Sequence, residues 1–281
     1  MKPIPEWNKK ALLHTPCFAP LYPVIVQLTS EEFPTLRDCN TLLSALQPAI
    51  AVSSGQPLRF VPQEHGKLPF EAQYEPRCYL RGEVPTREDN WHDLLSALVW
   101  LVFPKAKAAI NKRHFQEQTS GIDSSMRSQR GAARDTGTLL DESGVIVVYA
   151  DADLAELVRK FQWKELFWER RKQVQAGMGF YVFGHGLYEK FLSPYIGLTG
   201  QALLLPVEPP FFTWTQAMQL KHLDTMLADY LSSEANCRST RELTPLPLLG
   251  VPGWAADNEN AAYYDNTEYF RSGRHERSAR K

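Results

Sequence analysis

Two short segments of the sequence combine histidine with carboxylates at spacings that suit acid–base chemistry or metal binding. In NWHDLLSALVWLVFP, His92 and Asp93 stand at the polar start of an apolar run. In FGHGLYEK, His185 and Glu189 are four residues apart, so on a helix they would share one face. Imidazole nitrogens and carboxylate oxygens transfer protons, and together they suit zinc, iron or manganese. These four residues are therefore the candidate catalytic residues and the candidate ligands of a divalent metal ion.

The first segment predicts a buried helix over Asn90–Phe103, which Pro104 ends or kinks. Its residues from Leu98 onward are apolar on every side, as expected for a helix inside the protein. Burial of polar groups costs free energy unless they are paired, so His92 and Asp93 need partners, a solvent-filled cleft or a ligand. In the simpler interpretation Asp93 stabilises the first helical turn and His92 bonds a loop carbonyl.

Basic residues gather after this helix and could hold an anion. Residues 105–118 predict an amphipathic helix that presents Lys107, and Arg134 stands where a polar, basic stretch enters a predicted strand. Such cations pair with carboxylates inside a fold or bind anionic substrates, so we expect Lys107 and Arg134 to bind an anionic small molecule. The same local positive charge could attract RNA. However, the sequence has no nucleic-acid-binding motif, so nucleic acid is the less favoured partner.

The surrounding pattern predicts a single globular α+β domain over residues 1–270, mainly helical, with a small antiparallel or mixed sheet. The sheet would contain a hairpin over Thr138–Tyr149, turning at DESG, and a strand over Gln201–Val207. Residues 71–89 have the pattern of an extended segment. We further expect an irregular N-terminal wrap over residues 1–40, a mobile basic loop over 119–133 and a disordered basic tail over 271–281.

Composition narrows the class of protein. The 281 residues are 43% hydrophobic and 22% charged with a net charge of -1, which gives no overall attraction to nucleic acid or acidic membranes. The longest apolar run, Ala97–Phe103, is too short to span a bilayer, and MKPIPEWNKK lacks the apolar core of a secretory signal. The four scattered cysteines argue against a thiolate zinc site. We therefore expect a cytoplasmic protein without a membrane segment, and the oligomeric state stays open.

Four ordered blocks of the sequence together resemble a bacterial family, domain of unknown function 3025. They are NWHDLLSALVWLVFPKAKAAIN, RDTGTLLDESGVIVV, VFGHGLYEKFLSPY and PLPLLGVPGW, within a resemblance that spans roughly Arg59 to Trp254. The chain departs from the family at Ser96, where asparagine is usual, and at Gly137, where a larger residue is usual. The resemblance implies no activity, but it implies which positions carry the family pattern: Asn90, His92, Asp93, Lys107, Asn111, Arg134, Asp135, Asp141, Glu142, His185, Glu189 and Lys190.

Two hypotheses on function follow. In the first, the protein is a hydrolase or transferase, with or without a metal ion, that acts on an anionic small molecule. His92 would be a general base or metal ligand, and Asp93 its orienting partner or a further ligand. His185 and Glu189 would form a second acid–base or metal pair. The supporting residues would be Asn90, Ser96, Asn111, Asp135, Glu142 and Lys190.

In the second hypothesis the protein is a non-catalytic binding or adaptor protein. The same residues would then form a buried structural network, and the basic loop could contact RNA. The two hypotheses differ in whether His92 and His185 converge on one cavity, since metal–ligand bonds are only about 2 Å long.

Overall fold

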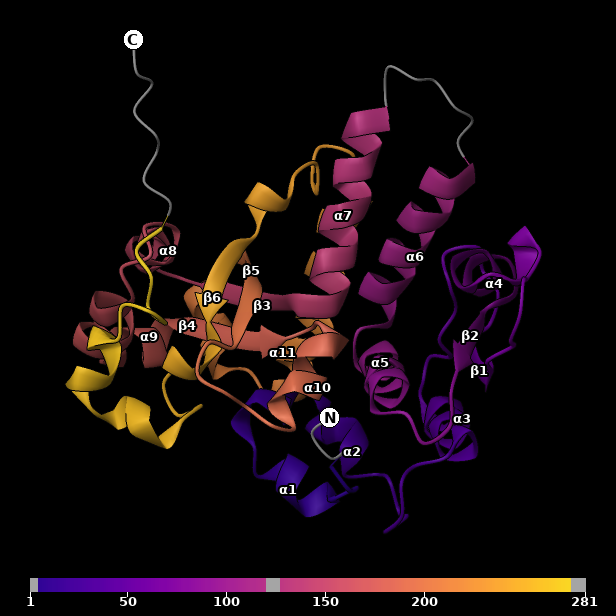
Figure 1. Cartoon of the computed structure of the whole chain (residues 1–281), viewed down its shortest axis with the longest axis horizontal. Helices are drawn as coiled ribbons and strands as arrows, with labels where there is room; N and C mark the ends of the chain where they lie inside the picture. The colour runs from indigo at the N-terminus through magenta and orange to yellow at the C-terminus, as the bar shows by residue number, and fades with distance from the viewer. Residues whose placement is uncertain (1–4, 120–126, 274–281) are drawn as a thin grey trace.

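The fold is α+β, as the sequence predicts, with a four-stranded mixed sheet and a two-stranded parallel sheet among helices. The structure is a computed structural model, and it describes residues 5–119 and 127–273. In Figure 1 the larger sheet lies on one side and the smaller sheet, with α3 and α4, on the other. Helices α5, α6 and α7 lie between them.

The larger sheet is built around β3 (Gly144–Tyr149) in the strand order β4-β3-β5-β6. Strand β4 (Met178–Val182) pairs antiparallel with β3, and β5 (Thr199–Pro206) pairs parallel with it. Strand β6 (Thr244–Pro247) is antiparallel to β5. The apolar run of β3 is almost wholly buried, as expected for a strand covered on both faces.

The predicted hairpin over Thr138–Tyr149 is wrong in its first half. Residues before Gly144 belong to helix α7 (Arg127–Ser143), and only the second half forms a strand. Buried Thr136 and Leu140 recur at a helical spacing, which the apolar character of TLL concealed. Because a Cβ at Gly144 would lie 2.3 Å from the Leu140 carbonyl oxygen, glycine is needed where the chain leaves the helix and enters the strand at once.

Two helices lead directly into one another at the centre of the molecule. Helix α5 (Trp91–Val102) is capped by Asn90, whose Oδ1 accepts the Asp93 backbone N–H at 3.1 Å. Helix α6 (Pro104–Thr119) starts at Pro104, as proline favours the first helical position. Helix α6 packs against α7 and against α11 (Gln216–Ser232). Asn90 and Pro104 therefore act as the helix boundaries that the sequence predicts.

The smaller sheet pairs β1 (Arg59–Pro62) with β2 (Glu83–Thr86). Part of the segment predicted to be extended is instead helix α4 (Tyr74–Arg81), which ends at Gly82 with a φ of 68°. This left-handed conformation suits glycine, and the helix brings Glu75 inward. Helix α3 (Leu36–Ala45) completes this side.

Short helices replace the irregular N-terminal wrap, because buried residues such as Phe18 and Leu21 recur at helical spacing and Pro16 starts a 3-10 turn. The predicted loop over 119–133 lies in part outside the described residues, and from Arg127 the chain is helical. Residues 274–281 of the predicted tail also lie outside the described residues. The remaining elements are α1 (Lys9–Leu13), η1 (Pro16–Leu21), α2 (Tyr22–Ile25), η2 (Phe70–Ala72), α8 (Ala152–Arg159), η4 (Glu165–Glu169), α9 (Arg171–Gly177), α10 (His185–Phe191), η5 (Pro209–Thr213), η6 (Thr240–Glu242), η7 (Leu248–Gly250), η8 (Ala256–Glu259) and η9 (Ala261–Asp265).

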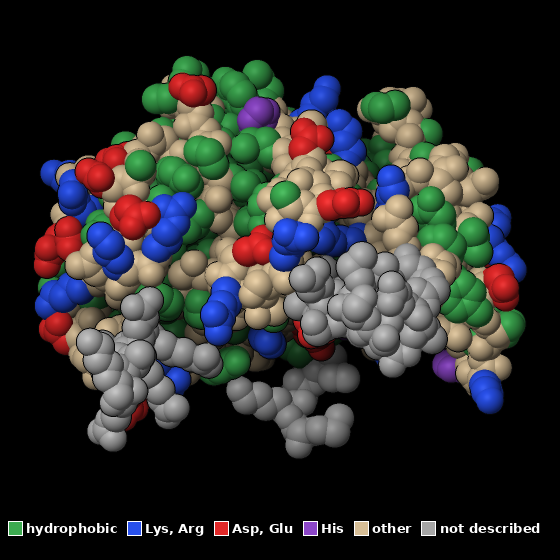
Figure 2. Space-filling model, turned by 90° about the horizontal axis from the view of Figure 1, so that it is seen from above, with side chains coloured by type: hydrophobic (Ala, Val, Ile, Leu, Met, Phe, Trp, Pro, Cys, Tyr) green, Lys and Arg blue, Asp and Glu red, His purple; other side chains and the backbone are tan. Residues whose placement is uncertain are grey.

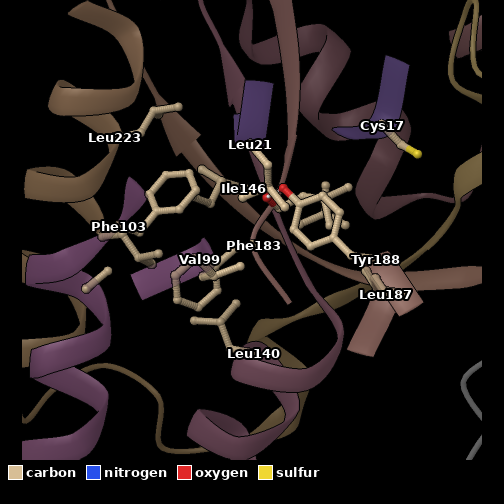
Figure 3. Close-up of a cluster of buried hydrophobic side chains, with 14 of the residues drawn as sticks. Cys17, Leu21, Val99, Phe103, Leu140, Ile146, Phe183, Leu187, Tyr188 and Leu223 are labelled. Carbon is tan, nitrogen blue, oxygen red and sulfur yellow. Dashed lines mark hydrogen bonds between the residues drawn. The ribbon is translucent and has the colours of Figure 1, made fainter. Parts of the chain in front are cut away.

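A hydrophobic core joins the helices that carry the candidate residues. Figure 3 shows Val99 of α5 and Phe103, the residue after α5, in one cluster with Leu140 of α7, Ile146 of β3 and Leu187 of α10. All five side chains are buried. Because protein interiors are close-packed, this contact fixes the ends of α5, α7 and α10 relative to one another. Among the helices of the described ranges, none has the length and hydropathy to cross a membrane.

Candidate metal centre

Three helix ends bring two histidines and a glutamate together. His92 lies in the first turn of α5, Glu142 in the last turn of α7, and His185 is the first residue of α10. The Nε2 atoms of His92 and His185 are 3.0 Å apart, and their rings meet edge to face with centroids 4.4 Å apart. Residues 93 positions apart in the chain therefore share one site.

The glutamate completes a triangle of ligand atoms. Glu142 Oε1 lies 3.7 Å from His92 Nε2 and 3.5 Å from His185 Nε2. Both distances exceed those of good N–H···O hydrogen bonds, which cluster near about 2.9 Å. However, metal bonds of about 2.0–2.1 Å in a tetrahedral site place neighbouring ligand atoms about 3.3 Å apart. The edges of 3.0, 3.5 and 3.7 Å bracket that value, so one ion could contact all three atoms.

The outer ring nitrogens of both histidines face carboxylates. His92 Nδ1 is 3.0 Å from Glu189 Oε2, which fixes the proton on Nδ1 and leaves the Nε2 lone pair facing the centre. His185 Nδ1 is buried and has no hydrogen-bond partner among the described residues, while Asp141 Oδ2 lies 3.8 Å away. If His185 Nε2 donates to His92, its Nδ1 is a bare acceptor facing that carboxylate. A metal on Nε2 would instead place an N–H there.

Asp141 is held ionised beneath His185 by a buried lysine. Lys107 Nζ donates to Asp141 Oδ1 at 2.6 Å and to Oδ2 at 2.8 Å. Burial alone would raise the pKa of Asp141, but the charge and hydrogen bonds of Lys107 outweigh it and hold that pKa below its usual value. Lys107, predicted to bind an anion, thus has its ammonium group engaged inside the protein.

The surroundings of His185 favour its neutral imidazole, which is the form that binds a metal ion. Burial lowers the pKa of His185 to about 4, outweighing the attraction of Asp141, so the imidazole is neutral at pH 7. Metal ligands must be deprotonated imidazoles and carboxylates. Burial, with help from the charges of Asp141 and Glu189, raises the pKa of Glu142. A cation bound between His92, Glu142 and His185 would offset the repulsion between Glu142 and these two carboxylates.

The two glycines of FGHG allow α10 to start directly against the end of α7. A Cβ on Gly184 would lie 2.5 Å from the backbone nitrogens of Ser143 and Gly144. A Cβ on Gly186 would lie 2.7 Å from Glu142 Oε2 and 2.9 Å from the Glu142 carbonyl oxygen. Both glycines are therefore needed to bring His185 to Glu142.

The centre opens into a cavity of about 610 Å³. Such a volume suits a small molecule, since ligand pockets enclose roughly 300–1,000 Å³. The walls come from α4, β2, α5, α6, α7, α10 and the loop after β1, and the lining residues are Gln63, His65, Tyr74, Glu75, Val84, Pro85, Thr86, Arg87, His92, Asp93, Ser96, His114, Gln118, Thr138, Asp141, Glu142 and His185.

A second histidine–carboxylate pair lies in the same cavity wall. His114 Nδ1 is 3.0 Å from Glu75 Oε1, and Asn111 Nδ2 donates to Glu75 Oε2 at 2.6 Å. Burial would lower the pKa of His114, but the hydrogen bond and charge of Glu75 raise it overall. No sequence pattern pointed to His114 or Glu75, because Glu75 fell in a segment that was expected to be extended.

Asp93 lies in the cavity wall but binds Arg87 instead of the histidines. Its Oδ2 accepts from the Arg87 backbone nitrogen at 2.8 Å and Nε at 3.0 Å, and its Oδ1 accepts from Nη2 at 2.8 Å. The pKa of Asp93 is lowered, since Arg87 outweighs the effect of burial. Of the other predicted residues, Asn90 caps α5, Ser96 and Asn111 are buried, Asp135 and Lys190 are exposed, and Arg134 lies in α7, its side chain outside the described part.

The centre falls within a recognised family. Comparison with curated proteins gave no match, and comparison with solved structures gave none either. A family model described as "protein of unknown function (DUF3025)" matches residues 58–274, which contain His92, Glu142 and His185. Because this match covers most of the chain, the protein belongs to the DUF3025 family.

Proposed function

We propose that the protein is a hydrolase that depends on one divalent metal ion held by His92, Glu142 and His185. The observation that carries the proposal is the triangle of ligand atoms. Its edges of 3.0, 3.5 and 3.7 Å bracket the spacing of metal ligands, and the two edges to Glu142 are too long for good hydrogen bonds. Two imidazoles and a carboxylate suit zinc, iron or manganese. Glu189 and Asp141 would orient the two imidazoles from behind.

Hydrolysis is the reaction that three protein ligands and an adjoining cavity support best. A catalytic metal with three protein ligands keeps a position for water, and bound zinc lowers the pKa of that water to about 7. The cavity that these ligands line would hold the substrate, which we propose to be a small anionic molecule. The bacterial origin and cytoplasmic location expected from the sequence stay predictions.

The alternative, a non-catalytic protein, is favoured by a different observation. Lys107 with Asp141, and Asn111 with Glu75, already form buried hydrogen bonds that need no ligand. Its RNA-binding version receives less support. Figure 2, which views the α6–α7 end, shows lysine and arginine mixed with aspartate and glutamate on the side chains drawn in colour.

Metal content tests the proposal. Protein purified without a metal-affinity tag or chelator, then given zinc and dialysed, is expected to hold about one ion per chain by elemental analysis. His92→Ala, Glu142→Gln and His185→Ala should each abolish that stoichiometric binding. Glu189→Ala should retain it with roughly 10–100-fold weaker affinity, as for a lost outer partner.

His114→Ala is the matched control, since His114 lines the same cavity outside the triangle, and it should load zinc normally. Substoichiometric metal in every wild-type preparation, with zinc, iron or manganese supplied, would contradict the proposal and favour the structural network. For the reaction itself, zinc-loaded protein should hydrolyse members of a panel of carboxylate- and phosphate-bearing esters. The rate should rise with pH near about 7 and vanish in the ligand variants.

A further inference from the structure

Arg87 is fixed in the cavity wall with part of its guanidinium group unused by its partner. It follows β2 directly, and its backbone nitrogen, Nε and Nη2 all donate to Asp93. The Asp93 side chain is only 12% exposed, whereas that of Arg87 is 51% exposed. Arginine presents donors in a planar fork, so this pairing leaves the Nη1 edge for a second partner.

Arg87 also lies near the metal centre. Its bonding partner Asp93 follows His92 in the first turn of α5. The hydrogen bond and charge of Asp93, and to a smaller extent the charge of Glu189, raise the pKa of Arg87. Glu189 is the residue that bonds His92 Nδ1. Arg87 is therefore on the side of the cavity where His92 lies.

Among the side chains that the structure describes, which leave out those of residues 127–134, no other lysine or arginine lines this cavity. Lys107 is 3% exposed and bonds both oxygens of Asp141, so it has no free donor edge toward a ligand comparable to that of Arg87. An anionic group entering the cavity would thus find one rigid cationic fork and, if our proposed function holds, one metal ion.

We propose that Arg87 binds the anionic group of the substrate, and that Asp93 is the residue that positions it. The inference rests on the proposed function and specifies it. The substrate would carry a carboxylate or phosphate group whose oxygens accept from the guanidinium edge, close enough to the metal for a neighbouring bond to be hydrolysed. Bidentate recognition of such groups is what arginine does better than lysine.

Charge in the cavity makes this binding depend on the metal. Among the described side chains, the carboxylates of Glu75, Asp93, Asp141 and Glu142 line it together with one arginine, Arg87. Among the described side chains, no lysine or arginine forms an ion pair with Glu142 as Lys107 does with Asp141. Anion binding is therefore expected in zinc-loaded protein and to be much weaker in metal-free protein.

Inorganic phosphate is the probe for the test. Calorimetric titration into zinc-loaded protein should show one site, with affinity about tenfold or more weaker in Arg87→Gln, as expected for lost charge-assisted hydrogen bonds. The phosphate affinity of Arg87→Lys should lie between those of wild type and Arg87→Gln, because lysine keeps the charge but lacks the planar pair of donors. Arg59→Gln is the matched control, since Arg59 is 60% exposed and paired with Glu83 but does not line the cavity.

Zinc stoichiometry, measured on the same samples, separates the two proposals. Full zinc loading with equal phosphate affinity in wild type and Arg87→Gln would overturn the role of Arg87 and leave the metal centre standing. Loss of zinc from Arg87→Gln would overturn it as well, because Arg87 would then support the centre instead of the substrate. A wild-type protein that takes up no metal would overturn both.

Discussion

Lys107 and Asp141 form a buried ion pair directly behind the candidate centre. The lysine side chain is 4% exposed, and its Nζ also lies 5.6 Å from the centroid of the Trp100 ring. Taking two charges out of water is costly, so each is stable here only because the other is present. The pair keeps a carboxylate ionised beside His185 Nδ1, which is the position of an outer partner of a metal ligand.

Lys107→Met should therefore leave an uncompensated buried carboxylate. We expect the free energy of unfolding, measured by urea denaturation at pH 7, to fall by about 3 kcal/mol. The double variant Lys107→Met/Asp141→Asn should recover part of that loss, because it removes both charges. Lys105→Met is the control, since Lys105 is exposed and its Nζ donates to the Thr225 hydroxyl, not to a buried carboxylate. A loss below about 1 kcal/mol without recovery would show that the pair contributes little.

At the residue scale, the sequence identified types but not partnerships. His92 and His185 stood out as chemical groups at predicted helix starts and Glu189 as the residue one turn after His185, and the structure brings all three together. Glu142 was expected only to support the site, since it fell in a predicted turn, and Asp93 was expected to join the histidines. Which side chains pair depends on which helix ends meet in the fold, and His92 and His185 are 93 positions apart in the chain. A local sequence pattern contains no information on such a contact.

Among the elements, the junction of α7 with α10 controls the centre. The start of α10 lies so close to the end of α7 that the backbone of Gly186 meets Glu142. Close packing leaves little room for the junction to relax. The position of the Glu142 carboxylate therefore depends on the absence of a side chain on the neighbouring helix.

Gly186→Ala should move Glu142 out of the triangle of ligand atoms. Zinc affinity, measured by competition with a chelator, should fall by about tenfold or more, with a loss of about 1–3 kcal/mol in stability from overpacking. Gly177→Ala is the matched control, because nothing lies within 4 Å of a Cβ there. Unchanged zinc affinity in Gly186→Ala would mean that Glu142 is not a ligand.

The sequence predicted some elements well and others poorly, for physical reasons. Helix α5 carried both a capping residue, Asn90, and a terminating Pro104, and β3 carried a continuous apolar run. The hairpin prediction failed because DESG suits a turn as well as it suits the last turn of a helix. Helix α4 was missed because the segment that contains Pro76 was expected to be extended, whereas tertiary contacts make it helical.

For the molecule as a whole, the pair of His114 and Glu75 links stability to pH. Because Glu75 raises the folded-state pKa of His114 above 6.5, the pair stabilises the protein fully below about pH 6.5. That stabilisation is lost as the pH rises through the folded-state pKa. His185 acts in the opposite sense: its folded-state pKa of about 4 means that its contribution is lost as the pH falls from about 6.5 toward 4.

The pH-dependent contribution of His185 to stability is present in both wild type and Glu75→Gln, so it cancels when the two are compared. The difference in unfolding free energy between the two should be largest near pH 6 and shrink toward pH 9, as measured by urea denaturation across that range. Glu71→Gln, at an exposed position nearby, should show no such trend. A difference that grows with pH would contradict the assigned direction of the His114 shift.

The three ligands of the centre come from distant parts of the chain, since residues 92, 142 and 185 are each separated by more than forty positions. An unfolded chain thus offers no two of them close enough to act as a chelate. An ion held at the proposed centre would bind only the native protein, and a hundredfold excess over its Kd would add about 2.7 kcal/mol to the free energy of unfolding. Metal supply in the cell would then set the lifetime and abundance of the protein as well as its activity.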